Sequence, residues 1–195
     1  MPQTNRSKQM FEAVSNENTR LVARMLAKNP ELVNISNGIS SPLYISVRHR
    51  CYRMAEILIE HGAEIDAGLL DEGYQFSTGD TPLIAAIQSN CTRSLKLLIK
   101  HGANLNIINS WGYCPLRVAI EYYNSKMFKY LLEAGADPNL EAPAGYPPLF
   151  YASHIFPASY QPSFLKLLRK FGADMGYKIP VCKESLEEWV HRHLA

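Results

Sequence analysis

The 195-residue sequence lacks the short motifs that mark many enzymes, and it also lacks long apolar segments. No GxSxG, HExxH, P-loop or GxGxxG string occurs, so the usual signatures of serine hydrolases, zinc proteases and nucleotide-binding enzymes are absent. The apolar stretches are far shorter than the roughly 18 residues of a membrane span. Residues 1–9 are polar, and no apolar run follows them as in a signal peptide. We therefore expect a soluble, cytoplasmic chain without a membrane partner.

An excess of one charge is missing as well, and cysteines are few. The chain has 20 Lys and Arg against 18 Asp and Glu, which gives a formal net charge of +2. Nucleic-acid binding usually requires a larger basic excess, so we expect no nucleic-acid partner. The four cysteines form no CxxC pair and no dense disulfide framework. They indicate reduced thiols in a cytosolic or nuclear compartment and predict no metal site.

The sequence does contain an internal repeat, within a composition that is 47% hydrophobic and can supply a core. Two short markers recur, a Pro-Leu pair and a Gly-Ala pair that follows it. Both markers share a basic period of about 33 residues, and so they predict a stack of repeated units. The Pro-Leu pairs begin at Pro42, Pro82, Pro115 and Pro148, and the Gly-Ala pairs begin at Gly62, Gly102, Gly135 and Gly172.

The residues between the markers predict two helices in each unit. Pro82 is suited to the first turn of a short apolar helix, where no amide donor is lost. Asn90 tolerates the positive φ of a turn. Residues 95–99 then place apolar side chains at i, i+3 and i+4, and Gly102 ends the second helix. Each unit is therefore predicted to be a helix-turn-helix followed by a loop.

This pattern resembles the ankyrin repeat, whose TPL opening and GA closing are the two markers described above. The resemblance implies an all-α solenoid of about five helix-turn-helix repeats with hairpin-like fingers. We expect one domain over residues 1–195, with repeats at about 8–37, 38–70, 78–110, 111–143 and 144–176. The first repeat lacks both markers, as terminal repeats often do. The histidine that follows TPL in the family is replaced by Tyr44, Ile84, Arg117 and Phe150.

Two segments depart from the repeat. The finger at residues 66–78 carries seven extra residues, because Gly62 and Pro82 are 20 residues apart where the later units have 13. It is either a binding finger or a hairpin that packs on its neighbour. Residues 183–195 contain an S-x-x-E capping box followed by apolar residues at helical spacing, and so predict a C-terminal capping helix. A docking helix for a partner is the alternative.

The resemblance implies a non-enzymatic protein-protein interaction module without cofactors, which binds a protein through its concave face and fingers. Such a module acts as an inhibitor, adaptor or effector-type scaffold, and we expect it to be a monomer. An effector would be delivered into a host cell. Tyr, Trp and Arg are enriched at interface hot spots, although about half of these aromatic side chains are expected to pack in the core. The candidate partner-binding residues are Arg48, His49, Tyr52, Tyr74, Phe76, Trp111, Tyr113, Arg117, Glu121, Tyr122, Tyr146 and Phe150.

Two alternative functions stay open. A ubiquitin-ligase substrate adaptor would use the C-terminal helix as its docking element. A small Cys- or His-dependent enzyme would need a supporting constellation, and the sequence offers none. His61 and His101 share the repeat position before the closing glycine, where a histidine suits a helix C-terminus. His191 and His193 are two residues apart and so make a weak metal pair.

Overall fold

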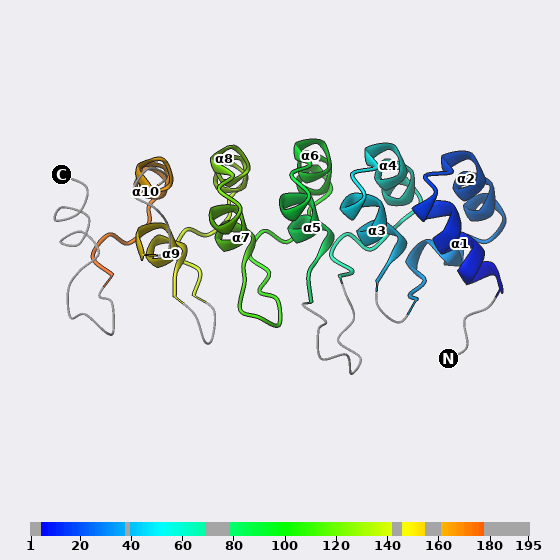
Figure 1. Cartoon of the computed structure of the whole chain (residues 1–195), viewed down its shortest axis with the longest axis horizontal. Helices are drawn as coiled ribbons and strands as arrows, with labels where there is room; N and C mark the ends of the chain where they lie inside the picture. Colours follow the sequence, from blue (N-terminus) through cyan, green and yellow to red (C-terminus); the bar gives the residue numbers. More distant parts are fainter. Residues whose placement is uncertain (1–4, 38–39, 69–78, 142–145, 155–160, 178–195) are drawn as a thin grey trace. The chain divides into compact units, whose positions relative to one another are not determined.

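The computed structural model describes residues 5–37, 40–68, 79–141, 146–154 and 161–177. These residues form five pairs of α-helices and a short 3-10 helix, and they contain no strand (Figure 1). The predicted all-α helix-turn-helix repeat is therefore confirmed. The helices are α1 (Asn5–Ser15), α2 (Thr19–Lys28), η1 (Pro30–Asn34), α3 (Pro42–Arg48), α4 (Tyr52–Glu60), α5 (Pro82–Gln88), α6 (Thr92–Lys100), α7 (Pro115–Glu121), α8 (Ser125–Glu133), α9 (Pro148–His154) and α10 (Gln161–Lys170).

The repeated prolines begin the first helix of each pair from the second repeat onward. Ser41 and Thr81 cap α3 and α5, because their hydroxyl oxygens accept hydrogen bonds from the backbone N–H groups of the residues three positions later. A tight turn joins the two helices in each of the first four repeats. It places one residue of each at positive φ: Glu17, Arg50, Asn90 and Tyr123. The sequence identified this conformation only at Asn90, because the other three residue types rarely adopt it.

The chain divides into two compact units. Unit 1 comprises Met1–Asn104 with Asn109–Trp111, and unit 2 comprises Leu105–Ile108 with Gly112–Ala195. In unit 1, α1, α3 and α5 form one layer and α2, α4 and α6 form a second (Figure 1). In unit 2, α7 packs against α8 and α9, and α10 packs against α8 and α9. The expectation of a single domain over residues 1–195 stays a prediction.

Leucines and other apolar side chains fill the space between the two helix layers in each unit. Leu58 and Leu98 of unit 1 are fully buried, as are Phe128 and Leu131 of unit 2. The ring of Phe128 meets the ring of Phe164 edge-on, with 5.1 Å between their centroids. Burial of side chains of this size supplies about 1.5–3 kcal/mol each, so the repeats are held together mainly by this apolar seam.

A ladder of Asn and Asp side chains links the loops of neighbouring repeats within each unit. In unit 1, Asn34 Nδ2 donates to the carbonyl of Gly62 at 3.1 Å and its Oδ1 accepts from the N–H of Glu64 at 2.8 Å. In unit 2, Asn139 makes the same pair of bonds to Gly172 and Asp174, at 3.1 and 2.7 Å. Asp66 and Asn106 occupy the same repeat position and accept from the backbone of Asn104 and Asp137. This ladder was not predicted from the sequence, where its signal is an Asn or Asp four residues after the closing glycine.

Several predicted features lie outside the described residues. They are most of the finger insertion at 66–78 with Tyr74 and Phe76, and the capping helix at 183–195. The docking helix that a ubiquitin-ligase adaptor would need falls in this same C-terminal segment. Among the helices that the structure describes, none has the length and apolar content needed to cross a membrane.

Candidate functional site

Arg117 is the centre of a cluster of aromatic side chains in unit 2. It is the third residue of α7, and its guanidinium carbon lies 3.7 Å from the centroid of the Tyr113 ring and 4.1 Å from that of Tyr151. Its Nη1 donates to the hydroxyl of Tyr151 at 2.9 Å, and its Nε donates to Glu121 Oε1 at 2.9 Å. Arg117 therefore lies against two rings, with its charge balanced by a carboxylate one helical turn away.

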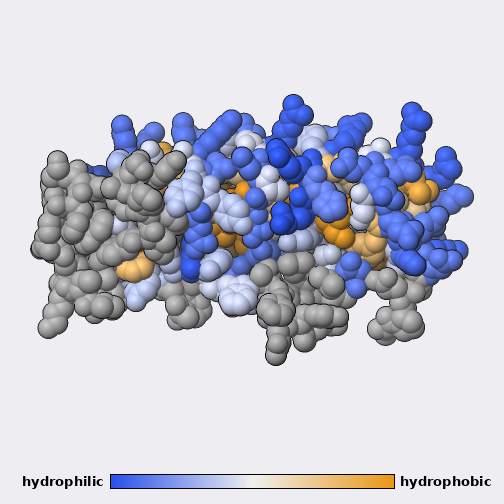
Figure 2. Space-filling view, in the orientation of Figure 1, coloured by the Kyte–Doolittle hydropathy of each residue, from blue (hydrophilic) through white to orange (hydrophobic). Residues whose placement is uncertain are grey.

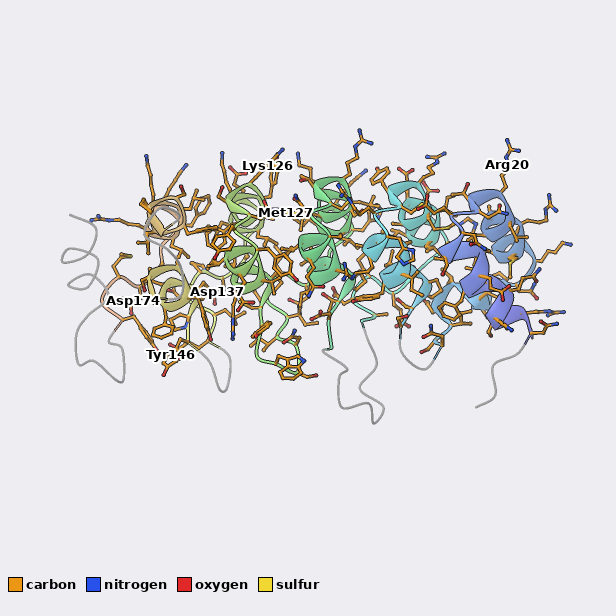
Figure 3. The ribbon with its side chains drawn as sticks, viewed as in Figure 1. Arg20, Lys126, Met127, Asp137, Tyr146 and Asp174 are labelled. Carbon is orange, nitrogen blue, oxygen red and sulfur yellow. The ribbon has the colours of Figure 1, made fainter. Side chains whose placement is uncertain are left out.

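The cluster continues onto α9 and the residues that precede it. The rings of Tyr146 and Phe150 are stacked with centroids 4.0 Å apart, and Phe150 meets Tyr151 edge-on at 5.6 Å. The hydroxyl of Tyr151 also accepts from the backbone N–H of Tyr146 at 3.2 Å. Tyr146 lies on the side of α9 where the loops between repeats are found (Figure 3). We call this group the Arg117 cluster; it consists of Tyr113, Arg117, Glu121, Tyr146, Phe150 and Tyr151.

The repeat itself explains why these side chains meet. Tyr113 and Tyr146 occupy the same position in successive repeats, and so do Arg117 and Phe150. In each repeat the first member lies two residues before the helix-starting proline, and the second lies two residues after it. The two side chains stack within each repeat, and packing of α7 against α9 brings the two pairs together. Five predicted partner-binding residues are thus assembled, and the structure adds Tyr151.

Exposure differs within the cluster. Tyr151 is buried, with 6% of its surface exposed, whereas Tyr113, Tyr146 and Phe150 are half-buried. Arg117 and Glu121 are half-buried as well, with 15% and 24% of their side chains exposed. Arg117 contacts the rings of Tyr113 and Tyr151 and so holds these two in place. The partly exposed rings of Tyr113, Tyr146 and Phe150 are the aromatic surface that a partner can reach. Tyr122, which caps the C-terminus of α7, is 51% exposed beside them in the chain.

Trp111 belongs to unit 1 and has the most exposed large apolar side chain among the described residues, at 56%. A buried polar network fixes its loop. The backbone N–H of Trp111 donates to Asn109 Oδ1 at 3.0 Å, and Asn109 Nδ2 donates to Asp80 Oδ1 at 2.7 Å. Gln88 Nε2 donates to the second oxygen of Asp80 at 2.8 Å. Asp80 and Asn109 are 4% and 7% exposed, so this network holds the loop of a surface tryptophan from inside the repeat.

The other predicted residues of unit 1 lie at the turn between α3 and α4. Arg48 ends α3 and His49 caps it, and both are exposed. Tyr52 begins α4, is half-buried and donates to Glu56 Oε1 at 3.1 Å. That hydrogen bond, with burial and the Glu56 charge adding to it, raises the pKa of Tyr52. The role of these three residues in binding stays a prediction.

The surroundings of the described cysteines and of His61 indicate structural roles. Cys51 and Cys91 precede α4 and α6 at the same repeat position; Cys91 is buried, whereas Cys51 is half-buried. Burial raises the pKa of the Cys51 and Cys114 thiols, so both are protonated at neutral pH. His61 caps α4, and its Nδ1 lies 2.8 Å from the carbonyl oxygen of Ile57. Within the described ranges, no three His, Cys, Asp or Glu side chains are grouped as a metal site would need.

The helix pairs and the Asx-linked loops define a helical repeat protein. A comparison with protein-family models agrees in detail: residues 65–142 match ankyrin repeats (3 copies). Residues 65–142 are therefore ankyrin repeats, as the two sequence markers predicted. A search of curated proteins finds no match. Ankyrin repeats indicate a protein-protein interaction module, and the ankyrin-repeat family is generally non-enzymatic.

Proposed function

We propose that the chain is a non-enzymatic recognition module that binds a partner protein through the Arg117 cluster of unit 2. The observation that carries this proposal is the arrangement of three partly exposed rings: Tyr113 packs on Arg117, and the stacked pair Tyr146 and Phe150 packs on Tyr151, which Arg117 also contacts. Tyrosine and arginine are among the residues that contribute most to protein interfaces. Rings that are already fixed lose little conformational entropy on binding, so their burial is converted efficiently into affinity.

The electrostatics of the cluster support a partner with apolar side chains rather than a charged one. Glu121 pairs with Arg117 at 2.9 Å, and both groups are mostly covered. The exposed part of the site is therefore aromatic and close to neutral. We infer that it receives apolar or aromatic side chains of the partner, with tyrosine hydroxyls available for hydrogen bonds at the rim.

Such a surface acts by covering a site on its partner or by holding the partner in place. Either mechanism suits an inhibitor, an adaptor or an effector-type scaffold. The protonated thiols of Cys51 and Cys114 give no support to a thiol enzyme, since the thiolate is the nucleophile. The free thiols also support our proposal of a reducing compartment, the cytoplasm.

The test is binding by a double variant, Tyr146→Ala/Phe150→Ala, with Tyr130→Ala as the matched control. Tyr130 lies on α8, in the second helix of the same unit, and is not part of the cluster. Proteins captured from cells of the source organism by the wild-type chain are identified, and their affinities for each variant are measured. We expect the double variant to bind at least about tenfold more weakly and the control to bind normally. Full affinity of a folded double variant would contradict the proposal.

A further inference from the structure

The small net charge of the chain conceals a separation of charge in unit 1. The second helices α2, α4 and α6 carry seven Lys and Arg against two Glu, Glu56 and Glu60. Hydrophilic side chains cover the edge of unit 1 formed by these helices (Figure 2). The seven basic residues are Arg20, Arg24, Lys28, Arg53, Arg93, Lys96 and Lys100.

Three of these side chains form a regular row. Arg20, Arg53 and Arg93 each lie two residues after the cap of their helix, and α4 packs against both α2 and α6. All three are exposed, and Arg20 points away from α2 (Figure 3). The charges of Arg53 and Arg93 both lower the pKa of Tyr52 against the larger effects that raise it, so the two guanidinium groups flank that residue. We call Arg20, Arg53 and Arg93 the arginine row.

An arginine in the first turn is unfavourable for the stability of the helix that carries it. The first turn of a helix is its electropositive end, so an acidic side chain stabilises it and a basic one does not. None of α2, α4 and α6 has an acidic residue in its first turn, and each has an arginine there. Adjacent helices pack about 8–10 Å apart, within about one Debye length, so the three cations also repel one another. In α4 the ion pair of Arg53 with Glu56 offsets this cost, whereas α2 and α6 contain no acidic residue. A charge that costs stability in these two repeats indicates a role in binding.

We propose that the arginine row and the basic side of α6 form a second docking surface, which binds an acidic segment of a partner polypeptide. A groove of about 540 Å³ lies between α4 and α6. Arg93, Lys96 and Lys100 line one wall, and Glu56 and Glu60 line the other. Guanidinium groups bind carboxylates through paired hydrogen bonds.

The glutamates that line one wall of the groove favour one class of negatively charged partner over the others. Arg53 already pairs with Glu56, so Glu60 carries most of the negative charge of this wall. That charge would repel the continuous phosphates of a nucleic acid or the headgroups of an anionic membrane. A polypeptide can place carboxylates against the basic wall and present N–H or basic groups to Glu56 and Glu60. Charge complementarity to both walls therefore favours a polypeptide, and this surface is separate from the aromatic cluster of unit 2.

The experiment compares Arg20→Glu/Arg93→Glu with Lys8→Glu/Lys166→Glu, which makes the same change in net charge at exposed positions outside the surface. Three fluorescent probes are titrated at about 20 mM NaCl: a Glu-rich peptide with interspersed Gly and Ser, an oligothymidylate of matched charge, and vesicles with about 30% phosphatidylserine. We expect the wild type to bind the peptide most tightly. The arginine variant should bind it at least about tenfold more weakly, and the control should change it less than about twofold.

Thermal stability gives a second readout that does not depend on peptide binding. Because Glu is favourable in the first turn of a helix, the Tm of the arginine variant should be unchanged or raised while binding is lost. Absence of peptide binding by the wild type overturns the proposal. So does an equal loss in both variants, which reflects net charge alone. Tighter binding of the oligothymidylate or the vesicles, lost in the arginine variant, replaces the polypeptide with a phosphate-bearing partner.

Discussion

Units 1 and 2 use the same two repeat positions in opposite ways. The positions lie two residues before and two residues after the helix-starting proline. In unit 1 both are buried, and in unit 2 they hold half-exposed rings and a partly covered arginine. The helix pair is the same in both units, so the difference comes from the side chains at these positions and from the neighbouring repeats that pack against them. The pairs are Ser40 and Tyr44, Asp80 and Ile84 in unit 1, and Tyr113 and Arg117, Tyr146 and Phe150 in unit 2.

Each unit also has a polar network at these positions, with opposite charge. In unit 1 the buried carboxylate of Asp80 accepts from Gln88 and Asn109. In unit 2 the guanidinium of Arg117 donates to Glu121 and Tyr151. The first network centres on the buried Asp80 and Asn109 and fixes a loop, whereas the second centres on the half-buried Arg117 and fixes aromatic rings. We therefore expect the first to matter more for stability and the second more for binding.

The largest effect is expected for Asp80→Ala. Removal of the buried carboxylate leaves the amide N–H groups of Asn109 and Gln88 without their acceptor, which should lower the free energy of unfolding by about 3 kcal/mol. Asp80→Asn keeps one oxygen acceptor and should lose less. Urea unfolding measures both, and the fluorescence anisotropy of Trp111, in a Trp189→Phe background, should fall in the alanine variant. A loss below about 0.5 kcal/mol would contradict a structural role of the network.

Arg117→Ala should have a smaller effect, about 2 kcal/mol, because the guanidinium is partly solvated but packs on two rings. Arg117→Lys keeps the charge without the planar fork and should recover only part of the loss. Thermal unfolding gives the comparison, with Arg169→Ala on the exposed side of α10 as control. If lysine restores full stability, charge pairing with Glu121 and not ring stacking holds the cluster.

The Asx ladder should make equal contributions to the two units. Asn34 and Asn139 each make two hydrogen bonds to the next loop, at exposed positions. Replacement of either by alanine should cost about 1 kcal/mol by urea unfolding. Asn16→Ala, at an exposed turn outside the ladder, should cost less than about 0.5 kcal/mol. Unequal losses at Asn34 and Asn139 would show that the two units do not share one linking mechanism.

The smallest effect concerns the thiols and pH. Burial raises the pKa of Cys114 above its ordinary value of 9.0. As the pH rises, the thiol ionises first in the unfolded chain, at about pH 8.5. The stabilisation that Cys114 gives to the folded state is therefore present at pH 7 and is lost as the pH rises further. Between pH 7 and 9 the free energy of unfolding should fall by less than about 1 kcal/mol, and by less still in Cys114→Ala. Iodoacetamide should modify the half-buried Cys51 before Cys114; the reverse order would contradict the burial of Cys114.

Much of the fold followed from patterns that are local in the chain. Proline at the start of a helix, apolar spacing of three and four, and a closing glycine predicted the helix pairs, because these effects act within a few residues. The ladder was missed, since an Asn or Asp four residues after the closing glycine marks a repeat position but does not show that its side chain bonds to a loop about 30 residues away. The network of Asp80 was missed for the same reason, because its partner Asn109 lies 29 residues later.

The candidate site was predicted only in part. Residue type selected Tyr113, Arg117, Tyr146 and Phe150, and their equivalent positions in successive repeats were already visible in the sequence. What the residues could not show was that Arg117 is enclosed by Tyr113 and Tyr151, so that it holds the rings instead of facing a partner. Net charge misled in a similar way. A total of +2 gave no sign that one helix layer of unit 1 carries most of the basic residues of that unit.

The sequence by itself determined the repeat, its period, the helix boundaries set by proline and glycine, and hence the class of protein. Only the tertiary structure decided which copy of a repeat position is core and which is surface. The physical reason is that the local rules depend on neighbours along the chain, whereas burial, stacking and charge segregation depend on neighbours one repeat away. Those neighbours fixed an aromatic cluster in unit 2 and an arginine row in unit 1.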